Sequence, residues 1–295
     1  MFTIGIIQDH ADADARSNLR RAERLVRDAA GRGAQIICLK ELFNALYFCK
    51  SQQCDRFDLA EPIPGPTTDA MQKLARELSV VIVVPIFERQ TAGLYRNSAA
   101  IVDADGSLLG VYRKMHIPDD PLFHEKYYFT PGDGHLDYHG EQAGEAGGSR
   151  VWKTRYATIG VLICWDQWYP EAARAMMLQR AEILLYPTAI GSEPYDLTLD
   201  THARWQRAMQ GHAVANAVPV VAANRIGVEQ NDGATQSYYG HSFIANHAGE
   251  LVASFGDKDE GVLAASFDLG DIERYRAEWG FFRDRRTDLY AKSIL

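Results

Sequence analysis

The sequence is poor in cysteine, in net positive charge and in long apolar runs. Its 4 cysteines in 295 residues are too few for a disulfide framework, although Cys49 and Cys54 lie close enough in sequence to pair or to bind a metal. The net charge of -8 argues against nucleic-acid binding, which needs clustered lysine and arginine. No apolar run approaches the roughly 20 residues that span a bilayer, and no basic stretch precedes the apolar N-terminus. We therefore expect reduced thiols, no nucleic-acid partner, no membrane association and a cytoplasmic location.

Several common catalytic motifs are also missing. The histidines form no His-Glu-x-x-His or similar zinc spacing, and no Gly-x-Ser-x-Gly elbow occurs. The glycines form neither a dinucleotide nor a phosphate-loop fingerprint. His202 and His212 lie in a predicted helix, and we interpret them as structural or pocket-lining residues. The sequence thus gives no support for a metal site or for serine-based hydrolysis.

Apolar strands alternate with helical segments along the chain. The pattern predicts strands over residues 2–8, 35–39, 80–87, 97–103, 108–113, 156–163, 183–186, 220–223, 242–246, 251–254 and 262–268, and helices over 13–30, 67–78, 170–180 and 199–217. This alternation favours an α/β layered fold with mixed sheets. Because no repeat or low-complexity tract interrupts it, we expect a single domain over residues 1–295, with the glycine-rich stretch 132–148 as a loop.

Three predicted strands end in polar residues, where layered α/β folds usually place catalytic groups. Glu41 follows strand 35–39, Lys114 follows strand 108–113, and Cys164 follows strand 156–163. Cys164 also precedes a predicted helix start, whose unpartnered backbone N–H groups can hold an oxyanion and favour a thiolate. A buried structural cysteine is the alternative interpretation.

Glu41 and Lys114 have the complementary chemistry that a cysteine nucleophile needs. A carboxylate held in a cleft can accept the thiol proton, and an ammonium can stabilise both a thiolate and a tetrahedral oxyanion. Glu125, further along the loop after Lys114, could orient Lys114 or relay a proton. Taken singly, Glu41 and Lys114 are better explained as solvated surface groups, and the loop position of Glu125 is only suggestive.

Taken together, segments 40–43 (KELF), 112–118 (YRKMHIP) and 164–171 (CWDQWYPE) resemble the signature regions of the nitrilase superfamily, in order and spacing. The resemblance covers nearly the whole chain. It implies a four-layer α-β-β-α sandwich with two mixed β-sheets. It further implies Glu41 as base, Lys114 as oxyanion stabiliser and Cys164 as nucleophile, assisted by Glu125 and the backbone N–H of Trp165. That chemistry needs no metal or organic cofactor.

Four more segments resemble the branch of the superfamily that acts on N-carbamoylputrescine. They are 114–121 (KMHIPDDP), 125–133 (EKYYFTPGD), 205–213 (WQRAMQGHA) and 220–227 (VVAANRIG). Tyr169, where the branch often has phenylalanine, and residues 122–124 (LFH) depart from its pattern. The resemblance implies that a small carbamoyl amine is hydrolysed through a Cys164 acyl-enzyme to putrescine, carbon dioxide and ammonia, on the route from agmatine to polyamines.

Such a substrate is cationic at the end far from its reacting carbon. Its pocket therefore needs an acidic group about 7 to 9 Å from the sulfur, judged from extended-chain rise. Glu193 is our first candidate because the end of strand 183–186 should open onto the same face as Cys164; Asp119, Asp120 and Asp196 are the others. Tyr47 and Trp165 are predicted to pack against the methylene chain. A solvated loop carboxylate is an equally good interpretation of Glu193.

Other functions stay open at this point. A carbamoyl amino acid would need a cation for its carboxylate, which Arg207 or Arg225 could supply. A true nitrilase and an ω-amidase are further alternatives. A catalytically silent interaction protein with the same fold is disfavoured, because such a relative has no chemical reason to keep all three triad residues.

The C-terminal region predicts self-association. Residues 279–286 (WGFFRDRR) and 290–295 carry aromatic side chains of the kind enriched at interfaces. The resemblance also implies pairing through a face of the sandwich. We therefore expect a homo-oligomer.

Overall fold

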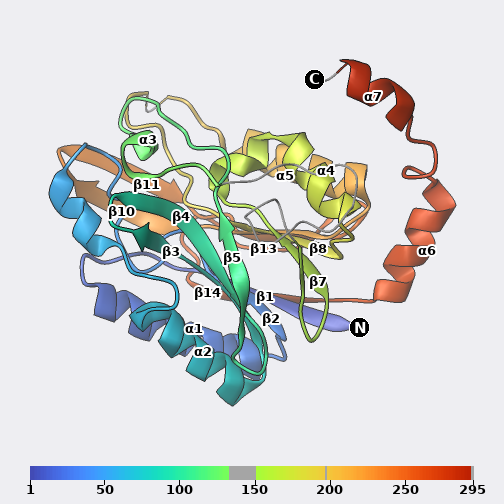
Figure 1. Cartoon of the computed structure of the whole chain (residues 1–295), viewed down its shortest axis with the longest axis horizontal. Helices are drawn as coiled ribbons and strands as arrows, with labels where there is room; N and C mark the ends of the chain where they lie inside the picture. The colour runs from blue at the N-terminus through green and yellow to red at the C-terminus, as the bar shows by residue number, and fades with distance from the viewer. Residues whose placement is uncertain (133–150, 197, 294–295) are drawn as a thin grey trace.

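The computed structural model describes residues 1–132, 151–196 and 198–293, which build two six-stranded mixed sheets (Figure 1). The first sheet contains, in spatial order, β14 (Gly261–Phe267), β1 (Phe2–Gln8), β2 (Ile36–Cys38), β3 (Val81–Thr91), β4 (Leu94–Val102) and β5 (Leu108–Arg113). The second contains β13 (Leu251–Ser254), β12 (Phe243–Ala245), β9 (Val220–Ala223), β8 (Ile183–Pro187), β7 (Thr158–Val161) and β6 (Val151–Lys153).

Helices cover the outer faces of both sheets. α1 (Ala15–Gly31) and α2 (Pro66–Leu78) pack on the first sheet, and α4 (Pro170–Leu178) and α5 (His202–Asn216) pack on the second (Figure 1). The predicted α-β-β-α sandwich is therefore confirmed. Within the described ranges, no helix has the length and apolarity required to cross a bilayer.

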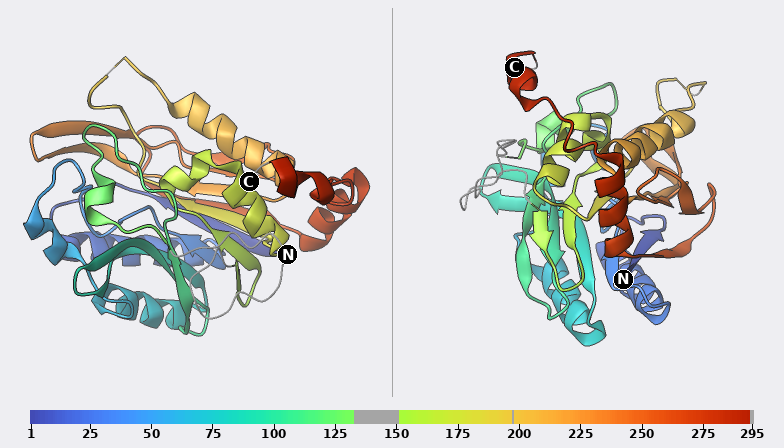
Figure 2. Two further views of the ribbon diagram at one scale, coloured as in Figure 1. Left: turned by 45° about the horizontal axis from the view of Figure 1, so that its top comes forward. Right: turned by 90° about the vertical axis from the view of Figure 1, so that its right-hand side faces the viewer.

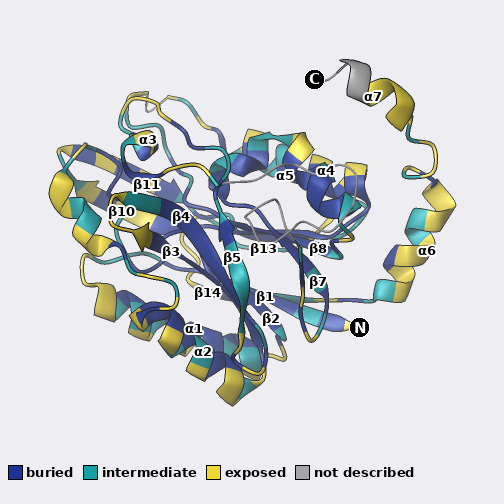
Figure 3. Cartoon of the chain, viewed as in Figure 1, coloured by how far each residue is buried: buried dark blue, intermediate teal, exposed yellow. Residues whose placement is uncertain are grey.

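The central strands of the first sheet are buried on both faces, which explains their continuous apolar runs, whereas the edge strands β5 and β14 are partly exposed (Figure 3). Successive side chains of a strand point to opposite faces. Ile6 and Val83 accordingly join the core that connects the two sheets, whereas Ile7 and Ile82 join the core beneath α1 and α2.

Several predicted boundaries shift. The strand expected over 156–163 is shorter, because the chain leaves β7 before Cys164 and turns into the short 3-10 helix η2 (Cys164–Trp168). The strand expected from residue 97 begins at Leu94 in β4, and the helix expected from residue 199 begins at His202 in α5. The loop predicted over 132–148 lies, beyond Gly132, outside the described residues.

Several elements were not predicted, although two of them carry clear local signals. β10 (Ile226–Asn231) and β11 (Ala234–Tyr239) form a hairpin whose turn residues Asp232 and Gly233 have φ of 51° and 78°, as an Asp-Gly turn requires. Helix α6 (Leu269–Trp279) is capped by the Asp268 carboxylate and ends at Gly280, with φ of 66°. The other additions are η1 (Cys54–Leu59), α3 (Glu125–Tyr128), α7 (Thr287–Ser293) and the edge strand β6.

Candidate active site

A buried lysine and two buried glutamates form the centre of the site. Lys114 follows β5, Glu41 follows β2, and Glu125 is the first residue of α3. The Lys114 Nζ lies 2.9 Å from Glu41 Oε1 and 2.7 Å from Glu125 Oε2. All three side chains are shielded from solvent, so the structure brings together three of the predicted residues.

The two carboxylates of this cluster differ in their hydrogen bonding. The amide of Asn97 donates to Glu41 Oε1 at 2.7 Å, but Glu41 Oε2 has no hydrogen-bond partner in the part of the chain that the structure describes. Glu125 Oε1 instead accepts from the Tyr47 hydroxyl at 2.6 Å. Glu41 is thus the carboxylate that retains a free acceptor atom.

Burial and charge act in opposite directions on the ionisation of this cluster. Burial lowers the pKa of Lys114, but the charges of Glu125 and Glu41 outweigh it and hold that pKa well above its usual range. Burial raises the pKa of Glu125, against the opposing effect of Lys114. Lys114 therefore remains an ammonium at neutral pH.

Cys164 is held in an unusual backbone conformation at the end of β7. It is the first residue of η2 and has a φ of 43°, in the left-handed region that non-glycine residues rarely adopt. Burial raises the pKa of its thiol well above the usual range, and the charge of Glu41 raises it further, despite the opposing effects of Lys114 and a backbone hydrogen bond from Ala189. Burial and the charge of Glu41 thus outweigh the local dipoles that favour a thiolate, so the raised pKa favours the thiol form of Cys164 at neutral pH.

Asp166 fixes the turn that carries Cys164. Its carboxylate accepts hydrogen bonds from the Tyr112 hydroxyl at 2.6 Å and from the backbone N–H of His116 at 3.0 Å, and it lies 2.7 Å from His116 Nδ1. Because Tyr112 and His116 flank Lys114 in sequence, these contacts tie the end of β5 to the Cys164 turn. Sequence reasoning did not identify this role for Asp166.

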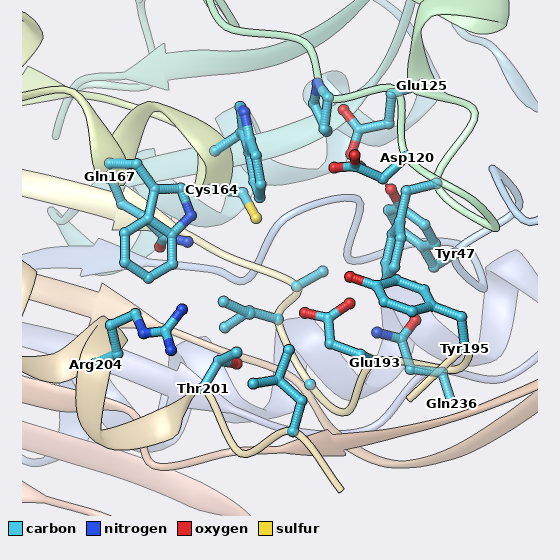
Figure 4. A pocket seen from close by; sticks show the side chains of 18 residues that line it. Tyr47, Asp120, Glu125, Cys164, Gln167, Glu193, Tyr195, Thr201, Arg204 and Gln236 are labelled. Atoms are coloured by element: carbon cyan, nitrogen blue, oxygen red, sulfur yellow. Dashed lines mark hydrogen bonds between the residues drawn. The ribbon is translucent and has the colours of Figure 1, made fainter. Parts of the chain in front are cut away.

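Cys164 opens into a pocket of about 330 Å³ (Figure 4). Among the predicted residues, Tyr47, Asp120, Glu125, Trp165 and Glu193 line this pocket with Cys164. Asp119 and Asp196 lie outside this lining. Asp119 precedes Asp120, and adjacent residues in an extended segment point to opposite sides, so one of the pair faces away from the pocket.

Glu193 places a carboxylate in the pocket wall. Figure 4 shows its carboxylate directed into the pocket, next to the Tyr195 ring. Burial raises the pKa of Glu193, while the Tyr195 hydrogen bond and the charge of Lys50 act against that rise. The prediction that β8 opens onto the same face as Cys164 is consistent with this position.

The arginines that we considered for a carboxylate substrate are not in the pocket lining. Arg225 is fully buried, pairs with Glu229 and donates to the carbonyl oxygens of Glu41 and Leu42, both at 3.0 Å. Arg207 is exposed on α5. Arg204 lines the pocket instead. It lies one helical turn before Arg207 on α5, and this helical spacing was the sequence signal that could have identified it.

Other pocket and support residues also escaped sequence reasoning. They are Asn97, Gln167, Tyr195, Thr201 and Gln236. Asn97 lies in β4 beside the end of β5, where its carbonyl accepts from the Lys114 backbone N–H at 2.8 Å. Only the pairing of β4 with β5 shows that the Asn97 side chain reaches Glu41.

A buried Glu–Lys–Cys site in an α-β-β-α sandwich is typical of a hydrolase of carbon–nitrogen bonds. Residues 3–277 match the carbon-nitrogen hydrolase family, and this chain belongs to that family. It is 53% identical to N-carbamoylputrescine amidase of Solanum lycopersicum, over 98% of this chain and 94% of that protein. It is 46% identical to citrullinase of Francisella tularensis, over 99% and 97%. The crystal structure of a carbon-nitrogen hydrolase from Helicobacter pylori G27 matches with a TM-score of 0.90 and 38% identity, over 100% and 98%.

Replacing Glu41 by glutamine should make Cys164 more reactive toward a small alkylating agent. The change removes a negative charge that raises the pKa of the thiol, so the thiolate fraction at pH 7 grows about tenfold for each unit by which the pKa falls. Iodoacetamide labelling, followed peptide by peptide with mass spectrometry, measures the rate. The exposed Cys54 serves as an internal reference. Slower labelling of Cys164 in Glu41→Gln than in the unmodified protein would contradict this electrostatic account and would show that the loss of Glu41 as a proton acceptor outweighs the loss of its charge.

Proposed function

We propose that this chain hydrolyses N-carbamoylputrescine to putrescine, carbon dioxide and ammonia. The observation that carries the proposal is one pocket that joins Cys164 and its buried Glu41–Lys114 pair to the carboxylate of Glu193. A carbamoyl group at Cys164 and an alkylammonium at Glu193 are the two ends of such a substrate. The 53% identity to a relative of that name supports the same assignment.

The first half-reaction forms a covalent acyl-enzyme. The Cys164 sulfur attacks the carbamoyl carbon while its proton passes to Glu41, whose free Oε2 is the available acceptor. Because the resting group is a thiol, attack and proton transfer occur together. Lys114 and the backbone N–H of Trp165 hold the oxyanion that develops. Glu41 then returns the proton to the leaving amine as the carbon–nitrogen bond breaks.

The second half-reaction reverses these roles with water as the nucleophile. Glu41 takes a proton from the water that attacks the acyl-enzyme, and the Cys164 sulfur leaves and regains a proton. The released carbamic acid decomposes to carbon dioxide and an amine. Glu125 keeps Lys114 charged and in position throughout, through its 2.7 Å contact.

The remaining part of the pocket binds the polar tail. Glu193 pairs with the distal ammonium, Asp120 adds negative charge nearby, and Tyr47 and Trp165 pack along the methylene chain. The uncharged reacting end and the cationic tail of the substrate are thereby bound in different parts of one cavity.

A ureido amino acid is a second candidate substrate, and Arg204 is the observation that favours it. Its side chain lies on the opposite side of the pocket from Tyr195 and Gln236 (Figure 4). An arginine can bind a carboxylate with two hydrogen bonds, so Arg204 and Glu193 together could hold both charges of an α-amino acid. The 46% identical relative named citrullinase is consistent with this alternative.

Ammonia release separates these candidates. We expect turnover of N-carbamoylputrescine to exceed that of citrulline, N-carbamoyl-β-alanine and a simple ω-amide. Replacing Cys164 by alanine should reduce turnover by about 10⁴-fold or more, because the nucleophile is lost. Preference for citrulline would move the assignment to the second candidate, and near-normal activity of Cys164→Ala would refute the mechanism.

Replacing Glu193 by glutamine should raise KM for N-carbamoylputrescine by about 10- to 100-fold, the value of one charge-assisted hydrogen bond. The kcat should change much less, since the reacting end is bound elsewhere. N-butylurea, which has no distal ammonium, is the matched substrate control and should keep its KM. An equal rise of KM for both compounds would show that Glu193 supports the pocket without recognising the charge.

We also propose that the protein acts as a cytoplasmic homo-oligomer assembled partly through its C-terminal arm, α6 and α7. These helices lie at the margin of the sandwich, outside its four layers (Figure 2). Trp279, Phe281, Leu289 and Tyr290 are exposed there, and all four cysteines are unpaired thiols. Contiguous exposed apolar side chains of this kind are typical of interfaces.

Replacing Trp279 by serine should therefore weaken the assembly, because Trp279 is 56% exposed and would be buried by a partner subunit. Light scattering across a dilution series measures the expected shift to lower mass. Val228→Ser, at a site that is 61% exposed on β10, is the matched control and should leave the mass unchanged. Equal masses for Trp279→Ser and the unmodified protein at every concentration would exclude the arm as an interface.

A further inference from the structure

Behind the distal part of the pocket lies a buried lysine that the mechanism does not use. Lys50 is 2% exposed, and its ammonium nitrogen lies 4.0 Å from the centre of the Phe123 ring and 4.8 Å from that of Tyr47. It also donates a hydrogen bond to Gln236 Oε1. Phe123, Tyr47 and Gln236 all line the pocket, so one cation contacts three of its wall residues from behind.

Lys50 has no carboxylate at ion-pair distance within residues 1–132, 151–196 and 198–293. Four ionisable groups on surrounding elements act on it: Cys49 beside it in sequence, Glu229 on β10, Glu125 on α3 and Glu193 after β8. Two of these carboxylates are already engaged, Glu229 by Arg225 and Glu125 by Lys114. Glu193 is the remaining one, and it is the proposed partner of the substrate ammonium.

The orientation of Gln236 is also fixed. Its amide nitrogen donates to the Ser192 carbonyl at 3.0 Å, which leaves its oxygen facing Lys50. Lys50 is therefore held in place by Gln236 whether or not it carries its third proton, because either form can donate.

We propose that Lys50 determines which charge the distal part of the pocket accepts: when protonated it opposes an alkylammonium at Glu193, and when neutral it permits one. This inference rests on the proposed function, since Glu193 is taken as the site of the substrate cation. The physical cause is repulsion between two cations that share one carboxylate in a region of low polarity. The affinity for a ligand with an uncharged tail would not depend on the charge of Lys50.

The protonation of Lys50 changes within the physiological pH range. Burial lowers the pKa of Lys50 to about 7, against the opposing effects of Cys49, Glu229, Glu193 and Glu125. The substrate amine stays protonated up to a pH of about 10. By linkage, affinity for the cation rises as pH increases through the Lys50 pKa, because binding then no longer has to displace a proton.

The test measures dissociation constants in a Cys164→Ala background, where the ligand stays intact. For N-carbamoylputrescine, Kd should be up to about 10-fold higher at pH 6 than at pH 8.5, the limit set by one proton with a pKa near 7. For N-butylurea, Kd should not change over this range. Calorimetric titration of both ligands gives these values.

Two substitutions at Lys50 should act in opposite directions. Lys50→Met removes the cation, so N-carbamoylputrescine should bind tightly from pH 6 to 8.5; any step that remains at lower pH belongs to Glu193. Lys50→Arg keeps the charge throughout, so binding should stay weak, by about 10-fold or more relative to unmodified Lys50 at pH 8.5. Lys73→Met, at an exposed position on α2, is the control and should retain the pH dependence.

A pH-independent Kd with Lys50 in place, or equal pH dependence in Lys50→Met, would overturn the inference. Circular dichroism identifies a variant that fails to fold, and the comparison between ligands in the Lys50 protein then decides. Failure of the proposed function is distinguishable, because it would appear as absent ammonia release by the Cys164 enzyme. The Kd for N-carbamoylputrescine can depend on pH whether or not that compound is turned over.

Discussion

The site depends on one buried ammonium held between two carboxylates. Lys114 contacts Glu41 and Glu125, all three side chains are buried, and each of the three residues comes from a different segment. Removing one member of such a buried group leaves an uncompensated charge, which typically costs about 3–5 kcal/mol. The ends of β2 and β5 and the start of α3 are therefore fixed relative to one another by electrostatics as well as by packing.

The same arrangement affects the protonation of Cys164, the proposed nucleophile. Two carboxylates and one ammonium leave a negative charge beside Cys164, which raises the pKa of its thiol together with burial. In the proposed reaction the thiol proton therefore passes to the free oxygen of the Glu41 carboxylate as the sulfur attacks. Asp166 acts from the other side, by holding Tyr112 and His116 and thus the geometry of the turn. The charges near the Cys164 sulfur thus come from Glu41, Glu125 and Lys114, whereas Asp166 holds the backbone of the turn.

The sequence alone was sufficient to pick out the site residues that directly follow a strand. Glu41, Lys114 and Cys164 each come just after an apolar run, at strand ends where layered α/β folds usually place functional groups; Glu41 and Lys114 follow strands of the first sheet, and Cys164 follows β7 of the second. Asn97, Asp166 and Arg204 were not predicted, because their roles depend on strand pairing, on side-chain rotation within a turn and on the helical face that α5 turns to the pocket. Asp119 and Asp120 show the limit most directly: adjacent residues of one type differ only in the direction they point. The β10–β11 hairpin and α6 were predictable, since Asp232-Gly233, Asp268 and Gly280 are standard turn and cap signals.

Lys50 connects the stability of the fold with the proposed selectivity of the pocket. A lysine buried without a carboxylate partner has a lowered pKa, so the unfolded chain binds its proton more tightly than the folded chain does. Stability from this group is therefore reduced below a pH of about 7 and recovers as pH rises toward the ordinary lysine range. A methionine of similar length could fill the space behind Tyr47 and Phe123 without that cost. Lysine at this position therefore lowers stability below neutral pH, and the proposed electrostatic control of Glu193 gives that cost a function.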